Sequence, residues 1–177
     1  MKLLKRIVVV VLLLPVLLLV VSLFLPSKYH VERSVMIKAP PATIFPLINN
    51  PSRWLEWTAW TRAKDSTLTY AYSGPAEGAG AASEWTSQTM GSGLMKFTSA
   101  DPQKGVRFDL SFDGGKFKSK GAVLIETNGE STKVTWTNDG ELGGNPIARY
   151  FGLFMDKMVG RDYEEGLEKL RRKVAPN

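Results

Sequence analysis

The longest run of apolar positions lies at the N-terminus, where the nineteen residues 7–25 contain no charged side chain. A helix of that length spans about 28 Å, close to the ~30 Å hydrocarbon core of a bilayer. The run therefore predicts a transmembrane anchor within residues 1–26. A cleaved signal peptide is the alternative, but its apolar region is shorter and ends at a small-residue site. Here Leu25 is followed by Pro26 and Ser27, which favours an uncleaved anchor.

Positive charges are concentrated before this apolar run. Lys2, Lys5 and Arg6 precede it, whereas Lys28 and Arg33 alone follow at short distance. Because positively charged flanks are retained in the cytoplasm, the N-terminus is predicted to be cytoplasmic. We expect a single-pass protein of the cell inner membrane, with the domain formed by residues 27–177 on the periplasmic or extracytoplasmic side.

After the apolar run, the period of the hydrophobic pattern changes to two. Val31, Val35 and Ile37 alternate with polar residues, which predicts a half-buried strand over residues 30–39. Two short helices are expected next, one interrupted by Pro46 and one opened by Pro51. Six further strands are predicted at 67–74, 81–87, 93–100, 105–114, 117–127 and 132–139, separated by glycine-containing turns. Their short connections require a largely antiparallel sheet.

The C-terminal residues return to helical spacing. Asn145 is a suitable N-cap and Pro146 suits the first helical position, so a long helix is predicted over 146–174. Its apolar positions form two stripes, one of Ile147, Phe151, Phe154 and Met158 and one of Val159, Tyr163, Leu167, Leu170 and Val174. The phase changes near Gly160, where we expect the helix to bend or to rotate its contact face.

Composition removes several kinds of chemistry. The 177 residues fit one ordinary domain and include no cysteine and one histidine, His30. Disulfides, thiolate nucleophiles and metal sites with two imidazoles are thereby excluded. The net charge of +6 falls to +3 beyond residue 6, where 20 basic residues face 17 acidic ones. That excess is too small to indicate a nucleic-acid partner, and we expect neither a cofactor nor a metal ion.

The order of these elements carries a family resemblance. The matching features are the strand 31–39 running into Pro40 and Pro41, then Phe45, the Trp54 and Trp57 pair, 72–74, Glu84-Trp85, 91–93, 132–136 and 166–170. Together, over about residues 29–174, they resemble the START-like superfamily, also called SRPBCC or birch-pollen-allergen-like, and within it the polyketide cyclase/dehydrase group. The resemblance implies an α+β helix-grip fold: a curved antiparallel sheet of about seven strands around the long C-terminal helix, with a cavity between them. It does not imply one activity.

The candidate ligand-binding residues are aromatic or apolar. Strand alternation places seven aromatic side chains on one face, and the first stripe of the C-terminal helix is expected to meet them. The predicted set is Tyr70, Tyr72, Trp85, Phe97, Phe108, Phe112 and Trp136 on strands, with Phe151, Phe154 and Met158 on the helix. Trp54, Trp57 and Trp60, spaced by three, are predicted near the cavity mouth. For any one of these residues taken alone, a place in a filled core is the favoured interpretation. For the set we expect several to border a pocket, and apolar walls with few polar groups suit a hydrophobic ligand.

No residue is singled out as catalytic. Alternation turns Glu84 and Asp109 to the face opposite the aromatic side chains, and His30 lies just beyond the predicted anchor. We therefore predict a membrane-tethered module that binds a hydrophobic small molecule or lipid in an internal cavity. Two alternatives remain open: a protein-interaction or co-regulator module with a filled cavity, and a cyclase/dehydrase-like enzyme.

Overall fold

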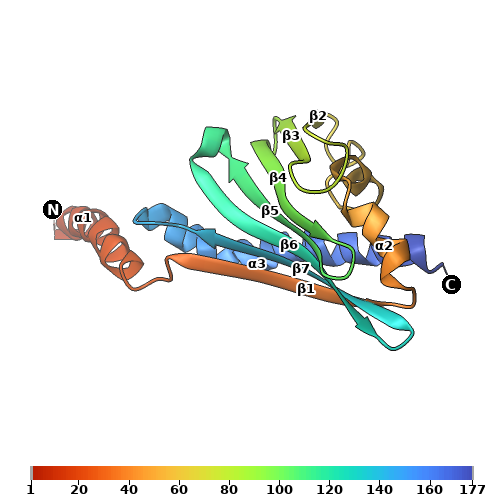
Figure 1. The fold of residues 1–177 in the computed structure, drawn as a ribbon. Helices are drawn as coiled ribbons and strands as arrows, with labels where there is room; N and C mark the ends of the chain where they lie inside the picture. Colours follow the sequence, from red (N-terminus) through yellow and green to blue (C-terminus); the bar gives the residue numbers. More distant parts are fainter. Residues whose placement is uncertain (1, 177) are drawn as a thin grey trace.

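The computed structural model describes residues 2–176 as a seven-stranded antiparallel sheet with helices at its ends and along one face (Figure 1). The helical elements are α1 (Lys2–Ser22), α2 (Pro41–Ile48), the 3-10 helices η1 (Pro51–Glu56) and η2 (Asp113–Gly115), and α3 (Pro146–Val174). The strands are β1 (Lys28–Ile37), β2 (Thr69–Ser73), β3 (Ala82–Ser87), β4 (Gly91–Asp101), β5 (Gly105–Phe112), β6 (Phe117–Asn128) and β7 (Ser131–Glu141). Every predicted strand is present, with ends within two residues of the prediction.

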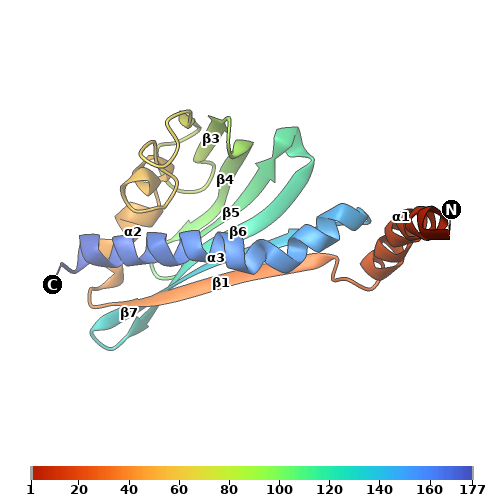
Figure 2. The ribbon, with the colours of Figure 1, turned by 180° about the vertical axis from the view of Figure 1, so that it is seen from behind.

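The sheet has the order β1-β7-β6-β5-β4-β3-β2, so the first strand of the domain pairs with the last. Figure 2 shows α3 lying lengthwise along β1, with the rest of the sheet curving away on one side of the helix. Helix α2 and η1 lie toward the C-terminal end of α3, whereas α1 extends from the opposite end (Figure 1). This is the helix-grip arrangement that the sequence predicted.

Strand alternation divides the sheet into two faces with different surroundings. Glu84, Arg107 and Asp109 are exposed, as predicted for the convex face. The hydrophobic core is formed by residues between Val31 and Leu170 on the concave face, on α2 and η1, and on the C-terminal half of α3. This core draws no residue from the described part of α1, and its described members all lie within residues 27–177.

Helix α1 is separate from the core, and the apolar side chains of residues 11–21 are exposed. Among the residues that the structure describes, none of the helices combines the length and the hydropathy needed to cross a membrane. The structure therefore does not support the transmembrane part of the fold prediction.

Helix α3 runs without interruption, and both signals predicted for its N-terminal end are confirmed. The Asn145 side chain accepts hydrogen bonds from the backbone N–H groups of Ile147 and Ala148, and Pro146 follows as the first helical residue. The second predicted stripe faces the core, with Tyr163, Leu167 and Leu170 fully buried.

The predicted phase change at Gly160 has a physical cause. The Arg33 side chain reaches from β1 across α3, and a Cβ at position 160 would lie 2.2 Å from its guanidinium. Arg33 is held there by ion pairs to Asp156 at 2.7 Å and Glu164 at 2.6 Å. These three side chains form an ion-paired strut between β1 and α3. On its C-terminal side α3 has the fully buried Tyr163, Leu167 and Leu170, whereas on its N-terminal side α3 contacts the core through partly buried side chains such as Met155.

Candidate ligand-binding surface

A cluster of aromatic rings fills the concave face under the C-terminal half of α3. Trp54 contacts Trp57, Phe97, Phe108 and Trp136, with ring centroids 5.0 to 5.8 Å apart. Phe97, Phe108 and Trp136 were predicted to line a cavity, but their neighbours leave them almost no exposed surface. At this end of the domain, packed side chains fill the space between the sheet and α3.

The prediction that Trp54 and Trp57 lie at a cavity mouth is wrong. Their side chains are 6% and 0% exposed, and their indole N–H groups donate to the carbonyls of Ile48 and Leu47. The +3 spacing placed them on one side of η1, and that side is turned into the core. Trp60 stays half-buried, where its indole donates to Asp162 of α3 and its ring contacts Trp136.

A second aromatic group lies along the same face nearer the β5–β6 turn and is incompletely covered. The ladder pairs Tyr70 with Trp85, Trp85 with Gly93, and Gly93 with Phe112. A Cβ on Gly93 would lie 2.1 Å from the Trp85 indole, so the absence of a side chain at Gly93 leaves the space that this ring occupies. Trp85 and Phe112 contact each other at 5.5 Å, and both remain half-buried.

The two tyrosines of β2 occupy the outer end of this group. Their rings stack at 6.3 Å and, with Leu55, Thr61 and Arg62, line a hollow of about 360 Å³. Burial raises the pKa of Tyr70 to about 12, and its hydroxyl donates to the Trp60 carbonyl. Tyr72 is exposed, so only part of this pair faces the interior.

The first stripe of α3 does not meet the sheet. The side chains of Ile147, Phe151, Phe154 and Met158 are between 57% and 68% exposed, which contradicts their predicted place in a closed cavity wall. Helix α3 instead rests on β1 through a different face, which contains Ala148, Gly152 and Gly160.

Helical spacing indicates which part of the domain the first stripe of α3 faces. Met158 is succeeded at +4 and +3 by Asp162 and Glu165, which contact Trp60 and Lys64 of the segment between η1 and β2. The same segment is bonded to the sheet through Tyr70. The segment of residues 57–68 thus bridges α3 and the sheet, with the stripe on one side of it and the half-covered aromatic residues on the other. Nearer the start of α3, the described residues form no such bridge.

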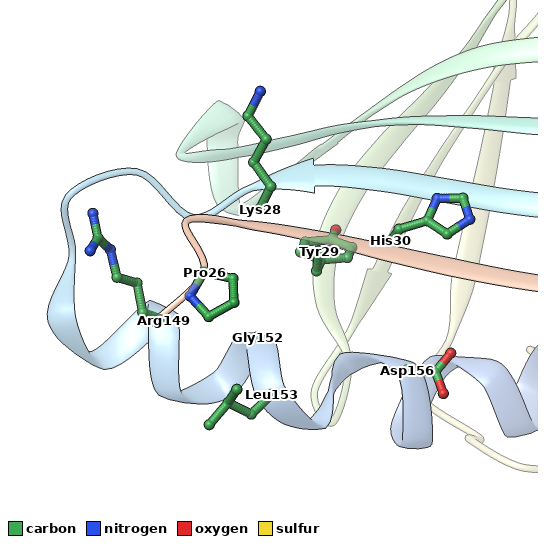
Figure 3. Close-up of a pocket in the computed structure, with 8 residues that line it drawn as sticks. All are labelled: Pro26, Lys28, Tyr29, His30, Arg149, Gly152, Leu153 and Asp156. Atoms are coloured by element: carbon green, nitrogen blue, oxygen red, sulfur yellow. The ribbon is translucent and has the colours of Figure 1, made fainter. Parts of the chain in front are cut away.

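A small hollow of about 120 Å³ lies between β1 and the start of α3, a position that the sequence did not indicate (Figure 3). Its lining comprises Pro26, Lys28, Tyr29, His30, Arg149, Gly152, Leu153 and Asp156. The His30 ring bonds Asp139 at 2.7 Å, and this hydrogen bond raises the pKa of the imidazole. The hollow is thus a polar niche at the junction between α1 and the domain.

The interior contains little that could act as an acid or base. Three buried polar side-chain atoms on the concave face, Ser119 Oγ, Trp136 Nε1 and Asn138 Oδ1, have no hydrogen-bond partner among the described residues. Beside them, burial raises the pKa of the Tyr29 and Tyr163 hydroxyls further above the neutral range. Within residues 2–176, no group of three or more metal-ligating side chains is found. The concave face is therefore largely apolar, with a few neutral polar atoms and with the charge of Arg33 paired to Asp156 and Glu164.

Comparison with known proteins agrees with this geometry. Residues 28–175 match the family described as polyketide cyclase / dehydrase and lipid transport. A search of curated proteins finds no match.

Solved structures with the same fold include Ara h 8.0201, with a TM-score of 0.58 and 14% identity over 85% of this chain and 99% of that one. DynU16, from the dynemicin biosynthetic locus, gives a TM-score of 0.57 at 15% identity over 83% of this chain and 47% of that one. CalU16 from Micromonospora echinospora gives 0.53 at 14% identity, over 84% and 85% of the two chains. At these identities the structures show the fold alone, an SRPBCC helix-grip, while the family match spans the whole domain. The chain belongs to the polyketide cyclase / dehydrase and lipid transport family.

Proposed function

We propose that the domain binds a hydrophobic small molecule or lipid between the exposed stripe of α3 and the half-covered aromatic residues of β3 and β5. The observation that carries this proposal is the stripe itself: four large apolar side chains on one face of a helix, left largely exposed by the residues that the structure describes. Contiguous exposed apolar surface of this kind marks a site that something else covers.

The chemistry of the site favours binding by area removed from water. Covering apolar surface contributes about 25 cal/mol per Å², or about 1.5–3 kcal/mol for one large apolar side chain. Phe151, Phe154 and Met158 together with Trp85 and Phe112 offer several such contacts.

The family match supports the same class of function, because its description includes lipid transport alongside cyclases and dehydrases. DynU16 comes from the dynemicin biosynthetic locus, an origin that is consistent with a ligand-binding domain. An enzymatic role receives less support, because Glu84 and Asp109 are exposed on the convex face and His30 pairs with Asp139 at the sheet edge.

One observation favours a second candidate, a module that binds another protein. The packed aromatic cluster around Trp54 occupies the end of the grip where a closed cavity was expected. The exposed stripe would then be a protein contact instead of one wall of a ligand site. The two candidates differ in whether the isolated domain binds a small apolar molecule.

From the sequence we also propose a membrane tether. The nineteen uncharged residues 7–25, preceded by Lys2, Lys5 and Arg6, support an anchor with a cytoplasmic N-terminus. The domain of residues 27–177 would then lie on the periplasmic or extracytoplasmic side of an inner membrane.

The ligand proposal is tested by titrating residues 27–177 with a fluorescent fatty acid. Phe154→Glu should weaken binding by about tenfold or more, because covering a large apolar side chain is worth about 1.5–3 kcal/mol and each 1.4 kcal/mol is a factor of ten. Thermal stability should change little, since Phe154 is exposed.

Ser92→Glu is the matched control, because it adds the same charge at an exposed position of β4 on the convex face. Its affinity should equal that of the wild type. Equal binding by wild type and Phe154→Glu would refute the ligand site, and absence of any binding by the wild type would favour the protein-interaction candidate.

A further inference from the structure

The exposed stripe of α3 lies beside the junction with α1. The Tyr150 hydroxyl donates to the Leu18 carbonyl at 2.7 Å, and Arg149 donates to the carbonyls of Ser22 and Leu23 at 3.1 and 3.3 Å. Ile147 and Phe154 are three residues before and four residues after Tyr150, which makes them its neighbours on the helix surface. The stripe therefore continues an apolar surface that begins on α1.

That surface is extensive at this end of the molecule. The apolar residues 11–21 of α1 are exposed, and so are Leu23 and Phe24 in the link to β1, with Phe24 at 84%. On the sheet, Phe117 at the start of β6 is also exposed. Figure 1 shows the start of α3 and the β5–β6 turn at the same end of the molecule as α1, away from the C-terminus. Exposed apolar groups thus gather at one end.

Polar groups border this apolar surface. Lys28, His30 and Arg149 line the hollow at the α1 junction, together with Pro26 (Figure 3). Tyr150 adds an aromatic ring with a polar tip. Cationic and amphipathic aromatic side chains beside exposed apolar ones are typical of a surface at the level of lipid headgroups.

We propose that the first half of α3 rests on a lipid bilayer, with Ile147, Phe151, Phe154 and Met158 in contact with acyl chains and Lys28 and Arg149 at the headgroup level. The open side of the ligand site then faces lipid directly, and the ligand it takes is a lipid of that membrane. This inference rests on the proposed function, because residues 1–26 hold the domain at the bilayer. It assigns a partner to a large apolar face that the described residues leave uncovered.

The absence of cysteine makes the test direct. Single variants Phe154→Cys and Glu130→Cys of the full chain are labelled with the fluorophore NBD and reconstituted into vesicles of phosphatidylcholine and phosphatidylglycerol. Glu130 lies in the exposed β6–β7 turn, at the end remote from α1 in Figure 1. Part of the phosphatidylcholine is then replaced by a lipid carrying a doxyl quencher on its acyl chain.

The label at position 154 should lose most of its fluorescence to the quencher, whereas the label at position 130 should lose almost none. Vesicle flotation is measured on the same samples. Chains that float with an unquenched label at 154 would overturn the inference and leave the tether standing. A blue-shifted but unquenched label at 154 would overturn it in favour of a second protein chain, and chains that do not float would overturn the tether and the inference together. Fatty-acid binding by residues 27–177 is independent of all three results.

Discussion

At the scale of single residues, the tryptophans show how one side-chain type takes two roles within one fold. Trp57 is fully buried and its indole donates to a backbone carbonyl, so it belongs to the core. Trp85 rests on Gly93 and keeps part of its ring exposed. Strand alternation predicts the face on which each ring lies, but coverage depends on α2 and η1, which are remote in sequence from the strands they cover. The sequence therefore predicts on which face of the sheet each ring lies, but not how deeply the ring is buried.

Two substitutions measure this difference in depth. Trp136→Ala should destabilise the domain by about 3–5 kcal/mol, because it opens a cavity among packed rings. Trp85→Ala should cost clearly less, because one side of that ring already meets solvent. Denaturant unfolding of both variants gives the comparison. Similar losses would show that Trp85 is as deeply packed as Trp136 and that the site is closed there.

The single histidine provides a pH prediction. The hydrogen bond to Asp139 is the largest cause of the raised pKa of His30, followed by opposing desolvation and by the charges of Asp139 and Glu32. Because the folded pKa lies above the unfolded value, the stabilisation is complete below the unfolded pKa, near 6.5, and is lost as pH rises through the folded pKa. Its size is small, since the His30 side chain is more than half exposed.

Proton NMR measures this directly, because the chain has one imidazole. The His30 titration midpoint should lie above the ordinary value and should fall toward it in Asp139→Asn. An unchanged midpoint in that variant would show that the Asp139 hydrogen bond is not formed in solution.

At the scale of elements, α3 is one helix with two environments. The spacing of its apolar positions predicted both stripes and the change of phase between them near Gly160. It could not predict that only the second stripe is buried, because both have the length and hydrophobicity of a core face. The strut formed by Arg33, Asp156 and Glu164 was also beyond the sequence pattern. Arg33 is more than 120 positions away from either acid, and the pairing depends on how α3 lies along β1.

The effect of Gly160→Ala on the free energy of unfolding tests the strut, because Arg33 should cancel or reverse the usual stabilisation. In a helix interior this substitution ordinarily gains about 0.5–1 kcal/mol, because glycine loses more backbone entropy on folding. Here the new methyl group displaces the Arg33 guanidinium from its ion pairs, so the gain should disappear or become a loss. In an Arg33→Ala background the ordinary gain should return. Equal effects of Gly160→Ala in both backgrounds, measured by urea unfolding, would show that Arg33 does not occupy this space.

At the scale of the whole molecule, the domain has a packed end and an open end. The aromatic cluster, α2, η1 and the C-terminal half of α3 close the grip at one end. Away from this end, Trp85 and Phe112 are half-buried and the first stripe of α3 is exposed. Figure 2 shows the start of α3 at the end that carries α1. This division reconciles the filled core with a binding function, because the two occupy different halves of the same concave face.

The most direct test of this account locates the ligand with a paramagnetic fatty acid. Residues 27–177 contain five tryptophans, whose indole N–H signals are resolved by NMR and assigned by substitution. A fatty acid carrying a doxyl group on its acyl chain should broaden the Trp85 indole signal and the backbone signals of residues 151–158. It should leave the Trp57 indole unchanged, because that group is buried and bonded to Leu47. Broadening of Trp57 without Trp85 would place the ligand in the packed core and contradict the account, as would a ligand that broadens neither.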